Sequence, residues 1–182
     1  VTITGGVTAT QADEIADATS GIVTATVTAD TAANLNSALV DSGSQVNAYT
    51  LTVNGTSAIA SDLIALAAKT SGIITISSTS GFSISMNSGE NLNLNGFINN
   101  VSGGTLTIND STGNENIIGT SGNDTINLTT GSDTVNTGSG DDMINIAIDN
   151  LDSIDTINGG DGTDSLNLST SGTLTSADVS NI

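Results

Sequence analysis

The chain has 182 residues, which is enough for one or two domains with a hydrophobic core. Nineteen acidic residues face a single base, Lys69, so the formal net charge is −18, which disfavours nucleic acid and anionic membrane surfaces as partners and favours cations. Cysteine and histidine are absent, which excludes disulfides, thiolate metal sites and imidazole chemistry.

The first 80 residues alternate between two kinds of segment. Residues 21–27, 48–54 and 72–78 show the apolar and polar alternation of strands, and each follows an alanine-rich segment with helical periodicity. A helix and a strand that recur about every 25 residues are typical of a solenoid with parallel strands. We therefore expect an α/β solenoid over residues 1–80.

Two helices can be placed from their apolar faces. In residues 28–39, Ala32, Leu35, Ala38 and Leu39 share one face, and Asp30 or Thr31 is available as the N-cap. In the second helix, within residues 57–72, the expected face is Ile59, Leu63, Leu66 and Ala67, and Gly72 is the expected stop signal.

From residue 79 the helical periodicity disappears while short strands continue. Residues 82–86, 91–94 and 103–109 alternate, with Ser, Asn and Gly between them. We expect a β-helix without helices over residues 81–109.

A shorter repeat starts at residue 110. The chain divides into nonapeptides whose sixth residue is acidic and whose eighth is apolar, with one step lengthened by four residues, which predicts a bulged corner or loop within 146–154. The pairs are Glu115 with Ile117, Asp124 with Ile126, Asp133 with Val135, Asp142 with Ile144, Asp155 with Ile157, and Asp164 with Leu166. Glycine permits unusual turn conformations and aspartate supplies hard oxygen ligands, so the pattern favours calcium. The apolar eighth residue should point inward.

The fullest repeat, GGDGTDSLN at residues 159–167, resembles the nonapeptide of the repeats-in-toxin (RTX, haemolysin-type) calcium-binding family. GTSGNDTIN and TGSGDDMIN match it less fully. The resemblance implies a right-handed parallel β-helix of the β-roll type over residues 110–182, in which two nonapeptides form one coil and Ca²⁺ lies between stacked turns.

The resemblance divides the turns into two columns. One ends in Asp124, Asp142 and Asp164 and is rich in glycine; the other ends in Glu115, Asp133 and Asp155 and is poor in glycine. We expect well-formed sites in the first column and partial or empty sites in the second. The family pattern gives the first ion carbonyls of Gly119, Ser121, Gly138 and Gly140 with carboxylates of Asp124 and Asp142, and the next ion carbonyls of Thr137, Ser139, Gly160 and Gly162 with Asp142 and Asp164.

Other interpretations of these acids are weaker. The repeats could form a glycine-rich linker without metal, and Asp133 and Asp155 could be solvated turn residues. Glu90 or Glu115 could serve in glycoside hydrolysis, but no aromatic platform for sugars accompanies them, so we expect no enzymatic activity.

These features lead to an expected function. The chain resembles part of a secreted bacterial cell-surface protein, of surface-layer or adhesin type, exported by type 1 secretion and folded outside the cell by calcium. It would meet copies of itself in a lattice or cell-surface glycans, without membrane insertion. The alternatives are the calcium-binding C-terminal module of a secreted protease, lipase or epimerase, and an ice- or glycan-binding face. The absence of an initiator Met suggests a piece of a longer polypeptide.

Overall fold

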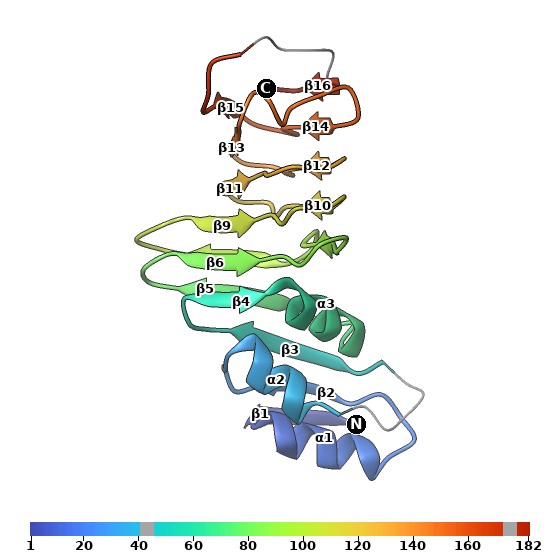
Figure 1. The fold of residues 1–182 in the computed structure, drawn as a ribbon. Helices are drawn as coiled ribbons and strands as arrows, with labels where there is room; N and C mark the ends of the chain where they lie inside the picture. Colours follow the sequence, from blue (N-terminus) through green and yellow to red (C-terminus); the bar gives the residue numbers. More distant parts are fainter. Residues whose placement is uncertain (41–45, 173–177) are drawn as a thin grey trace.

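The protein is an elongated stack of coils, seen in a computed structural model that describes residues 1–40, 46–172 and 178–182. Its strands form three sheets, and the strand pairings among the described residues are all parallel, so successive coils lie one above another along the long axis (Figure 1). The first sheet has the order β1-β2-β3-β5-β8, the second β4-β6-β9-β11-β13-β15, and the third β7-β10-β12-β14-β16.

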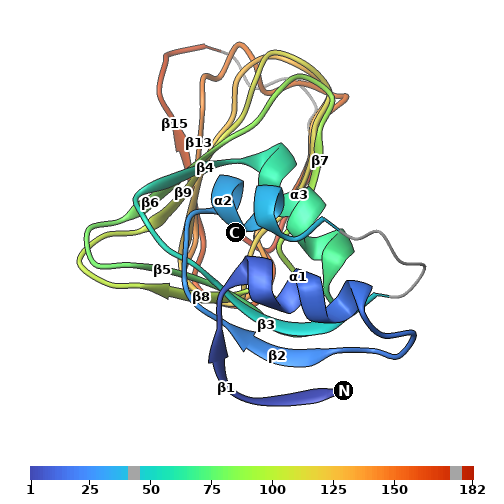
Figure 2. The ribbon, with the colours of Figure 1, turned by 90° about the horizontal axis from the view of Figure 1, so that it is seen from below.

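The N-terminal coils contain helices as well as strands. Helices α1, α2 and α3 stack along one side of the first sheet, as the view along the axis shows (Figure 2). The elements are β1 (Thr2–Val7), α1 (Ala9–Asp17), β2 (Thr24–Val27), α2 (Ala32–Ala38), β3 (Ala48–Val53), β4 (Ser57–Ile59), α3 (Ala60–Lys69) and β5 (Ile74–Ser78).

Local chemistry sets the limits of α2. Thr31 is its N-cap and its side chain accepts the N–H of Asn34 at 3.3 Å, while Asp30 accepts the Thr31 N–H. At the other end, the only base, Lys69, donates to the carbonyls of Asn36 and Leu39 from the neighbouring helix. A lysine therefore closes the last turn of α2, where carbonyls lack helical partners.

Helix α3, the second of the two expected helices, differs from the expectation in two ways. Its buried face is Ala60, Leu63 and Leu66, whereas the expected members Ile59 and Ala67 are exposed. Ile59 lies outside the helix, because residues 57–59 form β4 before it begins. Gly72 is not a helix cap. A Cβ there would collide with the carbonyl of Tyr49, so glycine is required by the close approach of β3.

The middle of the molecule has three strands in each coil. Its elements are β6 (Phe82–Ser85), β7 (Asn91–Asn93), β8 (Ile98–Val101) and β9 (Leu106–Asn109). Helix α3 contacts β7, so the column of helices is continued by the strands of the third sheet. The side of the solenoid that is helical near the N-terminus thus becomes a sheet.

After β8 the first sheet ends and each coil has two strands. These are β10 (Asn116–Ile118), β11 (Asp124–Asn127), β12 (Thr134–Asn136), β13 (Met143–Ile146), β14 (Thr156–Asn158), β15 (Ser165–Leu168) and β16 (Asp178–Ser180). Stacked residues are 24 apart between Ser78 and Ser102 but 18 apart between Asp124 and Asp142. Losing one strand and one corner shortens the coil, and residues 110–172 form a parallel β-roll.

The core of the roll is a narrow column of aliphatic side chains. The eighth residues of the first five nonapeptides are at most 1% exposed, whereas Leu166 in the last is only partly buried. The four extra residues form a corner loop between β13 and β14, where the N–H of Leu151 bonds the carbonyl of Ala147. Leu151 turns into the core and is 1% exposed, so the loop adds to the core.

A ladder of asparagine amides runs over the outer face of the second sheet. The side-chain NH₂ of each member after the first donates to the amide oxygen of the asparagine one coil earlier, at 2.8 to 2.9 Å. Its members are Asn109, Asn127, Asn145 and Asn167. This ladder ties the coils together without contributing charge.

Candidate metal centre

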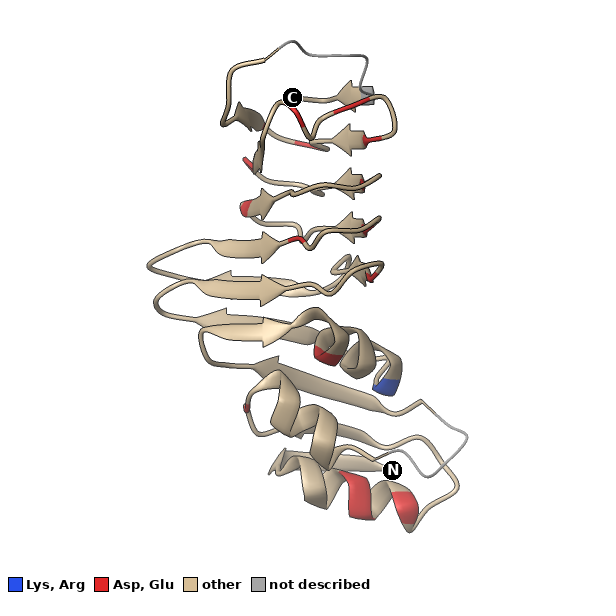
Figure 3. Ribbon diagram, viewed as in Figure 1, with Lys and Arg blue, Asp and Glu red and all other residues tan. Residues whose placement is uncertain are grey.

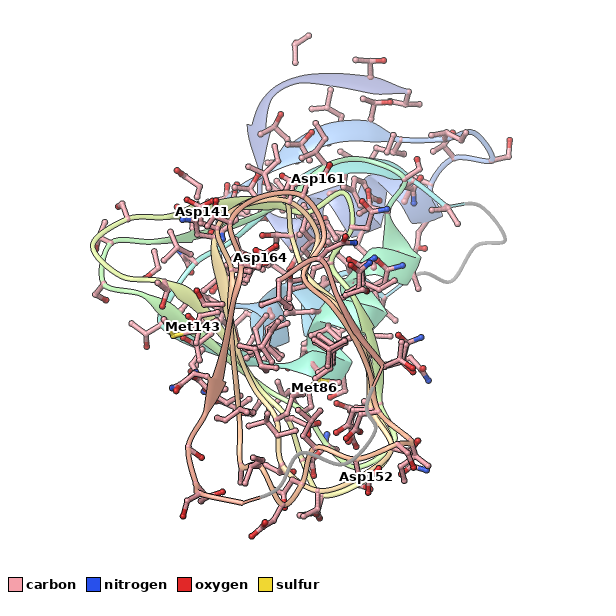
Figure 4. The ribbon with its side chains drawn as sticks, turned by 90° about the horizontal axis from the view of Figure 1, so that it is seen from above. Met86, Asp141, Met143, Asp152, Asp161 and Asp164 are labelled. Atoms are coloured by element: carbon pink, nitrogen blue, oxygen red, sulfur yellow. The ribbon has the colours of Figure 1, made fainter. Side chains whose placement is uncertain are left out.

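The acidic residues of the roll gather at its two corners. The first corner, where the chain passes from the third sheet to the second, comprises residues 119–124, 137–142 and 159–164; the second corner comprises 110–115, 128–133 and 150–155. Seen along the axis, Asp141, Asp161 and Asp164 lie at one corner and Asp152 at the opposite one (Figure 4). The acids recur from coil to coil along the stack (Figure 3).

All six acids at the sixth position are buried. Their exposed fractions are between 1% and 9%. This corrects the interpretation of Asp133 and Asp155 as solvated turn residues, since they are 1% and 2% exposed. The burial follows from the fold, because the sixth residue immediately precedes a strand, or in the case of Asp124 begins one, and lies where the coils stack. By contrast, Asp141, Asp149 and Asp161 are exposed.

One oxygen of each stacked acid is fixed by the backbone of the coil before it. At the first corner, Oδ1 of Asp142 accepts the N–H of Asp124 at 2.7 Å, and Oδ1 of Asp164 accepts the N–H of Asp142 at 2.9 Å. At the second corner, Asp133 accepts from Glu115 at 3.0 Å, and Asp155 from Asp133 at 2.9 Å. The acids therefore form two ladders that hold their carboxylates in register.

Several of the remaining oxygens are buried without a hydrogen-bond partner. They include Oδ2 of Asp142, Oδ2 of Asp164, Oε2 of Glu115 and Oδ1 of Asp110. A buried carboxylate oxygen that lacks a donor carries a large desolvation cost. A hard divalent cation compensates such oxygens, so the residues present fit Ca²⁺, which binds carboxylate and carbonyl oxygens.

The pKa values at the corners also show that the buried carboxylates lack positively charged neighbours. The pKa of Glu115 is raised to about 7, chiefly by burial and also by the neighbouring Asp110 and Asp133, although the Gly89 N–H lowers it. Burial also raises the pKa of Asp124 to about 7, although donors from Thr120 oppose the shift. Burial raises the pKa of Asp133 and of Asp142 as well.

Glycine shapes two turns of the first corner in the same way. Gly138 and Gly140, at the second and fourth positions of one nonapeptide, have φ of 107° and 124°, and Gly160 and Gly162, their equivalents one coil later, have φ of 85° and 144°. Glycine adopts these conformations with little strain. A Cβ on Gly160 would also collide with the carbonyl of Gly138, so the stacked backbones lie too close for any side chain.

The turn at residues 119–124 is built differently, although we expected it to resemble the other two. Its equivalent positions, Thr120 and Gly122, do not have positive φ. The Thr120 N–H and hydroxyl donate to Asp124 Oδ2 at 2.7 and 2.9 Å, and the Asn99 side chain donates to Oδ1 at 3.2 Å. Protein donors thus satisfy both oxygens of Asp124, where Thr120 replaces the glycine of the full repeat.

The structure also groups the carbonyls differently from the family-based expectation. Between the two glycine-rich turns, Gly138 O accepts the Asp161 N–H at 3.0 Å, and Asp161 O accepts the Gly140 N–H at 2.8 Å. Gly159 O faces the same gap, because it accepts the Thr137 hydroxyl. The carbonyl of Thr137 instead points back toward Gly119.

A ligand set for the gap between these turns therefore draws on different positions of each turn. The lower turn would contribute its second and fourth carbonyls, Gly138 and Gly140, and the upper turn its first and third, Gly159 and Asp161. The family pattern instead gives the lower turn's first and third carbonyls, Thr137 and Ser139. The direction of each carbonyl depends on the turn's φ and ψ angles, which the residue pattern does not specify.

The second corner contains a residue that the sequence analysis missed. One carboxylate oxygen each from Asp110, Glu115 and Asp133 lie within 4.8 Å of one another. Asp110 occupies the first position of its nonapeptide, where the full repeat has glycine. An acidic residue at this position, five residues before Glu115, is the feature of the sequence that could have predicted its part in the cluster. Asp155, in contrast, has both oxygens occupied, by the N–H groups of Asp133 and Asp152.

Comparison with known proteins identifies the repeats. Residues 110–144 and 151–169 match the family model of the RTX calcium-binding nonapeptide repeat, in four copies. That repeat family binds calcium ions, and RTX repeats are typical of secreted proteins. No curated protein and no solved structure matches the chain. In the part of the chain that the structure describes, no helix has the length and apolar character to cross a membrane.

Proposed function

We propose, from the premise that residues 110–169 carry RTX calcium-binding repeats, that this chain is a calcium-stabilised structural module of a protein exported by type 1 secretion. The observation that carries the proposal is the pair of carboxylate ladders, in which one oxygen of each acid is fixed and several second oxygens are buried without a donor. Such an arrangement holds a cation between coils and stabilises the stack when the cation is present.

Calcium acts in this proposal as a folding switch. With 19 acids and one base, the chain repels itself when calcium is scarce, as in the cytosol. Outside the cell, calcium cancels that repulsion and its binding free energy adds to the stability of the folded roll. The module would therefore remain open during export and close afterwards.

The role is architectural rather than catalytic. The buried acids of the roll bond to backbone N–H groups of neighbouring coils, which suits them to join coils. The continuous stack of parallel coils suits an extended surface-layer or adhesin-type protein, with copies of itself or cell-surface glycans as partners. An RTX roll attached to a secreted enzyme would have the same local structure, and a catalytic domain elsewhere in the full polypeptide would distinguish it.

Amide hydrogen exchange of the whole chain tests the calcium switch. In calcium-stripped buffer we expect strands β10–β15 to exchange rapidly, and with millimolar calcium to become protected. Strands β2, β3 and β5 should stay protected in both conditions, because their core of Tyr49, Leu51 and Ile76 packs against helices and lies away from the acid ladders. Equal protection of β10–β15 with and without calcium would contradict the proposal.

A further inference from the structure

The second corner begins with three carboxylates that converge at the junction of the β-helix and the roll. Asp110, Glu115 and Asp133 each place one oxygen within 4.8 Å of the other two. Calcium binds oxygen at about 2.3 to 2.6 Å, so two ligands of one ion lie at most roughly 5 Å apart. The spacing of the three oxygens is therefore that of ligands to a single ion.

Each carboxylate is held in place by a separate backbone donor. The N–H of Gly89 donates to Oε1 of Glu115 at 2.6 Å, the N–H of Thr129 to Oδ2 of Asp110 at 3.1 Å, and the N–H of Glu115 to Oδ1 of Asp133 at 3.0 Å. The three side chains are thus oriented by three different coils. In the folded stack these donors hold the three carboxylates in position for one ion.

Two oxygens of this cluster remain buried and unsatisfied. Oε2 of Glu115 and Oδ1 of Asp110 have no donor, and Glu115 as a whole is only 2% exposed. Asp133 is 1% exposed. A glutamate that is buried to this extent, with one oxygen fixed and the other free, carries its charge at low cost only beside a positively charged partner. Lys69 is the only basic side chain, and it is bonded to α2.

We propose that Asp110, Glu115 and Asp133 form a carboxylate-rich Ca²⁺ site that fills first and starts the closure of the roll. The inference rests on the proposed calcium-binding function and adds to it a distinct kind of site and an order of filling. It differs from the first corner because a third carboxylate, from Asp110, stands where the repeat would have a glycine.

The number of carboxylate ligands and the attachment of the site to the β-helix explain why this site fills first. Calcium affinity increases with the number of anionic ligands and with the rigidity of the site. This cluster supplies three carboxylates, against two for a gap at the first corner. One of the three is held by Gly89, which precedes the nonapeptides and lies in the turn before β7 of the β-helix. The first ion therefore binds against a coil whose folding does not depend on the repeats, and later coils stack on it.

Calorimetric calcium titration of the whole chain, with ions counted by native mass spectrometry, tests this order. The site variant is Asp110→Asn, the first-corner variant is Asp142→Asn, and the matched control is Asp149→Asn, which makes the same charge change at an exposed residue. For the parent and Asp149→Asn we expect a tight phase and a weaker phase. Asp110→Asn should lose one ion and weaken the tight phase at least tenfold, whereas Asp142→Asn should weaken only the later phase.

The outcomes separate this inference from the calcium function itself. If Asp110→Asn keeps the tight phase, or if Asp142→Asn abolishes it, the site and its priority are overturned while calcium binding stands. If the parent binds no calcium at all, both proposals fail. Glu115→Gln, which keeps the side chain's size, guards against a local defect at residue 110, since it should lose the same ion. Circular dichroism in calcium-stripped buffer should show equal helical signal in all variants.

Discussion

The Oδ1 oxygen of Asp164 accepts the backbone N–H of Asp142 at 2.9 Å across 22 residues of chain, whereas the equivalent bond between Asp142 and Asp124 spans 18 residues at 2.7 Å. The four extra residues therefore leave the ladder intact, because they are accommodated in the loop at the opposite corner. The pairing of β13 with β15 also keeps its register, with Ile144 opposite Leu166. The insertion at the second corner therefore leaves the hydrogen bonds and the strand register at the first corner unchanged.

Replacing Asp142 should weaken calcium binding at the first corner. Its Oδ1 accepts the Asp124 N–H of the preceding coil, and its Oδ2 is buried without a hydrogen-bond partner. Its own N–H donates to Asp164 of the next coil. In Asp142→Asn we expect calcium binding at that corner to fall at least tenfold, about 1.4 kcal/mol at each affected ion. Calorimetry beside Asp149→Asn would measure it, and equal binding by the two variants would contradict the ladder's role.

The structure changes our expectation for Asp133. The glycine-poor turn predicted that its loss would matter little, but the side chain is buried beside Asp110 and Glu115. Asp133→Asn should therefore also lose calcium. The double variant with Asp142→Asn should show additive losses, because the two residues lie at opposite corners. Strong coupling between them would show that the corners do not fill separately.

Gly160 should not tolerate a side chain. Its φ is 85°, and a Cβ would collide with the carbonyl of Gly138. Strain of about 1–2 kcal/mol in this conformation, added to the collision, should lower the free energy of unfolding of Gly160→Ala by at least about 2 kcal/mol. Urea denaturation with saturating calcium would measure this loss.

Gly122→Ala is the matched control for that substitution. Gly122 does not have a positive φ, and a Cβ there would lie 3.4 Å from the Asn99 side chain. We expect its free energy of unfolding to change by no more than about 0.5 kcal/mol. If the two variants were equally stable, the stacked turns would have to be farther apart than the structure shows.

The roll without calcium should lose stability as the pH rises. In the folded state the pKa of Glu115 and of Asp124 is raised to about 7, from ordinary values of 4.5 and 3.8. The folded roll therefore binds more protons than the unfolded chain between these values. Its stability is fully present below pH 4 and falls as the pH rises through about 7. Thermal unfolding in calcium-stripped buffer at pH 5 and pH 7.5 would show this fall.

Calcium affinity should rise with pH, whereas the stability of the calcium-free roll falls. Because the ion and the proton compete for the same carboxylates, calcium affinity should increase as the pH rises from 5 to 7.5. Titrations at the two pH values would measure the difference. Equal affinity at both would mean that the carboxylate of Glu115 does not take part in calcium binding.

Much of the architecture followed from periodicity in the sequence. The spacing of Ile126, Val135 and Ile144 predicted an inward column of apolar side chains, and these residues are at most 1% exposed. The nine-residue phase, together with the resemblance to RTX repeats in which two nonapeptides form one coil, predicted which acids stack. The hydrogen bonds between sixth positions of successive coils agree. Such features are local and repeat with the strand period, so a single sequence carries them.

Tertiary structure decided the features that depend on one coil meeting another. The number of glycines predicted a weak second corner, yet Asp110 and Asp133 come together there because the turn at 128–133 stacks on the turn at 110–115. Likewise, Thr120 looked like a small departure from the repeat. Its hydroxyl donates to Asp124 Oδ2, however, and so satisfies an oxygen that would otherwise face a cation. Sequence determined the register of the acids, whereas the burial and direction of each oxygen arose only when the coils were packed, since desolvation and hydrogen bonding depend on neighbours 18 to 26 residues away.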